Sequence, residues 1–255
     1  MTRLALLLVL AFCFCANAAA ETIAIGNVSV AYAIPAGFAR ADKLFPLNLK
    51  DMDKDFGLNT VVFAVLVPEE DIKIRQNDHR AIPRWYVHLA YDGFFSKHSI
   101  DNTGFTVTTW MMKNMIGEQY KNAGFIKKLE TVISGALNRK LKIHAMTQKG
   151  FVEDKPHHRS MLAYGHGELE GESGAEKVEL ATLTTFFMNQ GKLVSIIQAS
   201  RIESEKELPA FTERALRIAA EITRQPDEMK SGPVSRPPVQ NMHTGIQSLI
   251  SGSTR

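Results

Sequence analysis

The residue types best suited to chemistry are concentrated in one short stretch, 155–171, which reads KPHHRSMLAYGHGELEG. It holds three histidines, two carboxylates and a tyrosine, groups that bind transition metals or transfer protons. If the stretch is an extended strand, His158 and His166 are roughly 26 Å apart, at ~3.3 Å per residue. The histidines therefore cannot bind one metal ion along a single straight strand.

A closer set of ligands is reached across a hairpin. If 141–148 pair with 162–169 in the register that places His144 opposite His166, both rings lie on one face of the sheet, beside Glu168. Two imidazoles and a carboxylate can bind zinc or copper, so His144, His166 and Glu168 are the candidate metal ligands. A solvated sheet face carries the same residue types, and we prefer that interpretation. No other cofactor is predicted.

The sequence contains none of the usual local signatures of catalysis. G-x-S-x-G, H-E-x-x-H and G-x-x-x-x-G-K-[ST] are all missing. Serine, histidine and aspartate are plentiful, so a triad assembled by the fold stays open, but no catalytic residue is assigned. We expect a non-catalytic protein, with a metal-binding or hydrolytic enzyme as the alternative.

Residues 1–20 have the order of a secretory signal peptide. A basic residue precedes an apolar run, and A-x-A patterns allow cleavage after Ala18 or Ala20. A membrane anchor is disfavoured, because the apolar run is shorter than the roughly 20 residues that span a bilayer. Both cysteines, Cys13 and Cys15, would leave with this segment. We predict a cysteine-free periplasmic or secreted protein with no stable membrane span after cleavage.

Composition and charge exclude one class of partner. Hydrophobic residues make up 45% of the chain and charged residues 22%, with a formal net charge of +3. Charges of both signs are interspersed, so no basic face for nucleic acid stands out. The chain is long enough to bury the core of one domain without disulfides.

The N-terminal part of the chain predicts strands. Alternating apolar residues on both sides of Gly26-Asn27 predict a hairpin. The run 60–68 is apolar on both faces and predicts a central strand covered on both sides. Residues 69–83 are polar and are interpreted as a connection, and 85–92 alternate as in a half-buried strand.

Two helical stretches follow, over about 109–124 and 125–140. The first carries Trp, Met and Ile at helical spacing. Core packing is the preferred interpretation of this stripe, because methionine fills irregular gaps, and an apolar ligand surface is the alternative. On that alternative, Trp110 and Tyr120 are candidate ligand-binding residues. Tyr164 and His166 are the candidates on the face of the predicted strand 160–170.

The last third predicts an antiparallel meander followed by a helix. Four strand-like runs, separated by segments with Gly or Pro turn chemistry, cover 141–200. Ser204 and Glu207 form an S-x-x-E capping box, and apolar residues recur at helical spacing from Leu208 to Ile222. Together the elements predict an α+β fold with one antiparallel sheet and helices packed on one face.

We predict three segments: the signal peptide 1–20, a single α+β domain over 21–224, and a flexible tail over 225–255. The tail is rich in Pro, Gly and Ser and shows weak periodicity. An alternative for the tail is a partner-docking segment built from Ile246, Leu249 and Ile250.

Three stretches carry a resemblance to a known family: the hairpin ending in IPAGF, the strand pair TLTTFFMNQGKLVSIIQAS and the helix ELPAFTERALRIAAEI. Their order resembles the PsbP/Mog1-like α+β fold, which includes small exported bacterial lipoproteins of the DcrB type. This chain departs from that pattern in having no lipobox and a longer two-helix insertion. The resemblance implies a binding or assembly factor and supplies no catalytic residues.

We therefore expect an exported soluble protein of the bacterial cell envelope that acts as a non-catalytic binding or assembly accessory factor. Its partner would be an envelope protein or a small ligand. A structural subunit whose tail docks on a partner is a further alternative.

Overall fold

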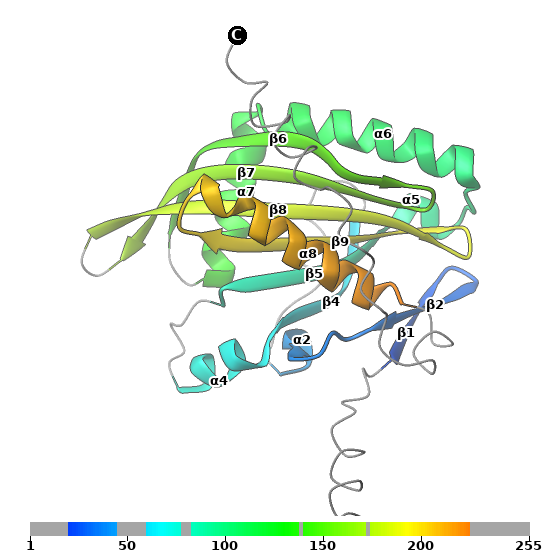
Figure 1. The fold of residues 1–255 in the computed structure, drawn as a ribbon, viewed down its shortest axis with the longest axis horizontal. Coiled ribbons are helices and arrows are strands. Elements are labelled where there is room, and N and C mark those ends of the chain that lie inside the picture. The colour runs from blue at the N-terminus through cyan, green and yellow to red at the C-terminus, as the bar shows by residue number, and fades with distance from the viewer. Residues whose placement is uncertain (1–19, 45–59, 78–82, 138–139, 172–173, 225–255) are drawn as a thin grey trace, which may run out of the picture.

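The computed structural model describes residues 20–44, 60–77, 83–137, 140–171 and 174–224 (Figure 1). The predicted signal peptide, apart from Ala20, and the predicted tail lie outside these residues. Among the described residues, no helix is both long enough and apolar enough to cross a bilayer.

The main element is a seven-stranded antiparallel sheet in the order β3-β4-β5-β9-β8-β7-β6. The α+β class and the C-terminal meander are confirmed. The strands are β3 (Phe38–Arg40), β4 (Thr60–Pro68), β5 (Trp85–Asp92), β6 (Leu141–Lys155), β7 (His158–Gly171), β8 (Gly174–Asn189) and β9 (Lys192–Ile202).

The predicted N-terminal hairpin is present as a separate two-stranded sheet of β1 (Ala20–Ile25) and β2 (Val28–Ala33). Gly26 in its turn has a φ of 63°, which a residue with a Cβ rarely adopts. Ile25, Val30 and Tyr32 are buried in the main core. The hairpin is therefore joined to the seven-stranded sheet by side-chain packing.

The helices are α2 (Ala41–Leu44), α4 (Glu69–Asn77), α5 (Gly93–Ser96), α6 (Asn102–Gln119), α7 (Ala123–Leu137) and α8 (Leu208–Ile222), with a short 3₁₀ turn at Glu205–Glu207. Figure 1 shows α8 in front of the sheet, with α7 behind it and α6 along the β6 edge.

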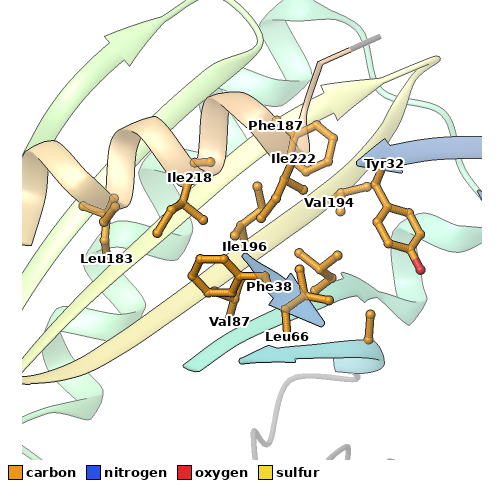
Figure 2. Packing of buried hydrophobic residues seen from close by; sticks show 14 of the residues in the cluster. Tyr32, Phe38, Leu66, Val87, Leu183, Phe187, Val194, Ile196, Ile218 and Ile222 are labelled. Atoms are coloured by element: carbon orange, nitrogen blue, oxygen red, sulfur yellow. The ribbon is translucent and has the colours of Figure 1, made fainter. Parts of the chain in front are cut away.

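The prediction that helices pack on only one face of the sheet is wrong, because helices cover both of its faces. Adjacent residues of β8 separate the two sides, because Phe187 packs in the core beneath α8 whereas Phe186 packs in the cluster beneath α6. The core beneath α8 also contains Ile218 and Ile222 of this helix, which point at the sheet in Figure 2. Apolar residues on both sides of the strands require a helical layer on each face.

The helices differ from the prediction in three places. The polar stretch after β4 forms the helix α4, where the sequence predicts a connection. Helix α6 begins at Asn102, earlier than expected, because the side chain of Asp101 accepts a hydrogen bond from the backbone N–H of Gly104. Gly124 lies in the first turn of α7 and does not end α6.

Candidate functional site

The predicted metal ligands lie on neighbouring strands but do not converge. Nε2 of His144 on β6 lies 3.4 Å from Oε1 of Glu168 on β7. The ring centroids of His144 and His166 are 6.2 Å apart. Within the described parts of the chain, no group of three or more His, Cys, Asp or Glu side chains is placed to hold a metal ion.

A β-bulge explains this geometry. The expected register holds where Lys142 pairs with Glu168. It then shifts at the bulge after Ile143, so that Ala145, in place of His144, lies opposite His166. His144 is the extra residue of the bulged strand. The candidate metal site therefore stays a prediction, with one imidazole–carboxylate contact to support it.

Tyr164, the next candidate on β7, is held in a polar cluster. Its hydroxyl donates to Oε2 of Glu179 at 2.6 Å, and Nζ of Lys149 lies 5.7 Å from its ring centroid. Burial, followed by the hydrogen bond to Glu179, raises the pKa of Tyr164. The same ring packs against the main core. Tyr164 is therefore half-buried and fixed.

The described residues do bring a serine, a carboxylate and a histidine together, in the wrong order for a nucleophilic triad. Nδ1 of His158 lies 2.6 Å from Oε2 of Glu153, and Oγ of Ser160 donates to the same oxygen at 3.4 Å. A triad needs the histidine between the nucleophile and the carboxylate. Ser160 is also fully buried, and its hydroxyl contacts Thr185.

Helix α6 has an inner face that packs as an ordinary core element. Phe105 is buried with Phe186 and Leu193 of the sheet, and Met112 and Ile116 pack against this cluster. Two residues of the sheet fix the position of the helix. Nη1 of Arg159 donates to the carbonyl oxygen of Thr106 at 3.1 Å, and Nε2 of Gln148 donates to the carbonyl of Lys113 at 2.9 Å.

The outer face of α6 carries a row of exposed apolar side chains. Val107 is 51% exposed, Trp110 58%, Met111 59% and Met115 39%. We call these four residues the apolar row. Core packing, the interpretation preferred from the sequence, holds for Met112 and Ile116 but is wrong for Trp110, Met111 and Met115. Burying one helical face leaves the other to solvent, and the stripe was wide enough to cover both.

Tyr120, at the end of α6, lies on the sheet side. It is hydrogen-bonded to Thr182 on β8, and its ring is 6.0 Å from that of Phe125. Burial is the main cause that raises the pKa of Tyr120. The four predicted ligand-binding residues are therefore divided. Trp110 faces outward on α6, and Tyr120 faces the sheet. Tyr164 packs against the core on the side that α8 covers, and His166 is exposed on the same strand.

The apolar row is unusual within this chain. Helix α8 also covers the sheet, and its exposed residues include Glu213, Arg214, Arg217 and Glu221. In α6, Lys113 is the single charged residue between Asn102 and Gly117, and its Nζ lies 5.2 Å from the ring centroid of Phe151. The near absence of charge over four helical turns was the sequence signal for this surface.

No protein-family model matches this chain, and no curated protein matches it in sequence. Among solved structures, the solution structure of cyanobacterial PsbP (CyanoP) from Synechocystis sp. PCC 6803 is similar, with a TM-score of 0.34 and 11% sequence identity over 82% of this chain and 94% of that one. At this level the similarity is a weak likeness of fold.

Proposed function

We propose that this chain is an exported, non-catalytic binding or assembly accessory protein that engages its partner through the apolar row of α6. The exposure of Val107, Trp110, Met111 and Met115 on one helical face carries the proposal. An aromatic and two methionine side chains in water are unfavourable for a free protein, and contiguous apolar patches mark interaction sites.

The alternative explanation, an incidental apolar surface, is disfavoured by the charge pattern. Single exposed hydrophobic residues are normal on proteins, but here they recur at i, i+3, i+4 and i+8 on one helix. The first three positions match the i, i+3 and i+4 spacing of anchor residues in helix recognition. Helix α8 of the same chain has charged residues on its exposed face.

Site-specific photocrosslinking in native cells tests this surface. A benzoylphenylalanine residue in place of Val107 should form adducts with the partner, because this position is half-exposed in the apolar row. The matched control is Ala220, an exposed alanine on α8. Equal adducts at both positions, or no adduct with any protein or lipid at either, would contradict the proposed binding surface.

Export is the second part of the proposal and has its own test. The mature protein isolated from the envelope fraction should begin after Ala18 or Ala20, as N-terminal sequencing or intact mass would reveal. An unprocessed chain beginning at Met1 in that fraction would contradict export by a cleaved signal.

Metal binding is a second candidate function, supported by the contact of His144 with Glu168 at 3.4 Å. Zinc or copper would need His166 to turn toward this pair. Metal analysis of protein purified without an affinity tag is the test. A stoichiometric ion that is lost in both His144→Ala and His166→Ala supports the site, and a metal-free native protein removes it.

A further inference from the structure

We propose that the partner of the apolar row is a lipid surface with anionic headgroups, on which α6 lies parallel to the membrane plane. This inference rests on the proposed function and names the chemistry of the partner. Interfacial helices place Trp and other large apolar residues at the headgroup level and carry lysines beside them. The segment from α5 to α7 contains exposed aromatic residues and exposed lysines.

The apolar row and helix α5 expose aromatic side chains. The apolar row contains Trp110, the one exposed tryptophan of the described residues, since Trp85 is 5% exposed and packs 5.0 Å from Phe211 between ring centroids. Helix α5, which shares the core cluster beneath α6 through Phe95, exposes Phe94 by 60%. Aromatic side chains are the residues that anchor proteins at the boundary between water and hydrocarbon.

The segment from α5 to α7 carries a net positive charge. Residues 93–137 contain five lysines and three carboxylates, a formal charge of +2, close to the +3 of the entire chain. All three carboxylates have partners within the protein: Asp101 caps α6, Glu118 pairs with Lys121 at 2.7 Å, and Glu130 accepts from the N–H of Ile143 at 2.8 Å. Lys97, at the end of α5, and Lys127 of α7 are exposed. Exposed lysines at a membrane surface favour anionic lipid.

The size of the apolar row disfavours a second copy of the chain as its partner. One large side chain has an area of about 150–250 Å², so four side chains that are each about half exposed present an apolar surface on the order of 400 Å². A stable protein interface needs about 800 Å² from each partner. A convex helical ridge inserts into a lipid surface without a complementary shape, so a small area suffices there.

Intrinsic fluorescence makes the test direct, because the sequence contains two tryptophans and one is buried. The mature protein is mixed at low salt with vesicles of phosphatidylcholine, alone or with phosphatidylglycerol. We expect the emission of Trp110 to shift to shorter wavelength and to be quenched by lipids brominated on the acyl chains. The response should be strongest with phosphatidylglycerol and should weaken with added salt.

Two variants separate the apolar and the ionic contributions, and both keep Trp110 as the probe. Met111→Ser should lower partition into anionic vesicles about tenfold, because it removes buried apolar surface. Lys97→Gln should lower it about fivefold on anionic vesicles and leave neutral vesicles unaffected. Ala220→Ser on α8 is the matched control and should change neither. All three positions are exposed, so thermal unfolding should be unaltered.

Each outcome has a fixed meaning. A blue shift and quenching that Met111→Ser weakens and Ala220→Ser does not would support the inference. No response to either kind of vesicle, or a response that Met111→Ser leaves unchanged, would overturn it. If vesicles fail while sedimentation shows self-association that Met111→Ser abolishes, or Val107 crosslinks to one protein, the lipid inference is overturned and the proposed binding surface stands. Failure of vesicles and crosslinking together overturns both.

Discussion

At the scale of single residues, Glu153 at the end of β6 is held by hydrogen bonds from two basic side chains. Burial opposes its charge, but hydrogen bonds from His158 and Lys155 outweigh burial and lower the pKa of Glu153 to about 2. The Nζ of Lys155 lies 2.5 Å from Oε1 of Glu153. The cluster therefore stabilises the turn that joins the two long strands.

Glu153→Gln should destabilise the protein at neutral pH by roughly 1–2 kcal/mol, after allowance for partial solvent screening. The folded-state pKa is lower than the ordinary value of 4.5. The stabilisation is therefore fully present above that value and is lost as the pH falls toward about 2. Urea unfolding at several pH values measures it. A deficit that stays constant down to pH 2 would contradict the assignment; Glu213→Gln, on the exposed face of α8, is the control.

Gly167 lies at a close approach of β6 and β7. A Cβ at this position would lie 2.3 Å from the carbonyl oxygen of Lys142, which belongs to the backbone and cannot rotate away. Gly167→Ala should therefore cost about 2 kcal/mol or more in chemical denaturation. Ala163→Gly on the same strand removes a methyl group without a clash and should cost less. Equal losses would argue against the close approach.

The candidate site illustrates what residue patterns can predict. Leu162 and Tyr164 lie on one face of β7 and Met161 and Leu169 on the other, as the period-two spacing of a strand requires. That spacing could not predict the bulge at His144, because an inserted residue follows from the packing of two strands and leaves no periodic signal.

At the scale of elements, α6 differs from α8 because apolar residues lie on both its inner and its outer face. Its inner face is part of the core, and its outer face is available for a partner. Substitutions on the inner face should therefore lower the free energy of unfolding, and substitutions on the outer face should weaken binding.

Phe105→Ala should destabilise the protein by about 3–5 kcal/mol, because a fully buried aromatic side chain is lost from the cluster under α6. Trp110→Ala should change the free energy of unfolding by less than about 1 kcal/mol, since exposed positions contribute little. Thermal and urea unfolding of both variants decide the matter. A large loss for Trp110→Ala would show that its side chain belongs to the fold.

Elements with strong periodicity could be predicted, and elements defined by local caps could not. The apolar stripe of α8, from Leu208 to Ile222, is buried as expected. The polar helix α4 lacks such a stripe and was missed. The proposed capping box is replaced by a 3₁₀ turn in which Ser204 makes no side-chain cap and Glu207 accepts from the N–H of Glu203 at 3.2 Å.

At the scale of the whole molecule, the N-terminal hairpin depends on a charged cluster as well as on core packing. Arg40 on β3 forms hydrogen bonds with Glu21 of β1 at 2.5 Å and with the hydroxyl of Tyr32 on β2 at 2.6 Å. It also contacts Asp42 and donates to the carbonyl oxygen of Phe63 at 3.0 Å. One guanidinium thus connects the hairpin to the main sheet.

Arg40→Met should loosen the hairpin selectively, because Glu21 and Asp42 would lose their shared cation. Hydrogen exchange should become faster in β1 and β2, while β7, β8 and β9 keep their protection. Lys43→Met removes an exposed lysine that also contacts Glu21 and is the milder control. Uniform acceleration across the sheet would contradict a local role for Arg40.

The strand order has a further consequence for how the chain acquires its structure. Trp85–Tyr91 of β5 pairs with Val194–Ser200 of β9, so the two halves of the sheet are joined by residues more than one hundred positions apart, as in the bond from Trp85 to Gln198 at a separation of 113. Such distant pairing makes closure slow. A nascent chain cannot complete this sheet before β9 has left the ribosome, so β5 has no partner from β9 until then.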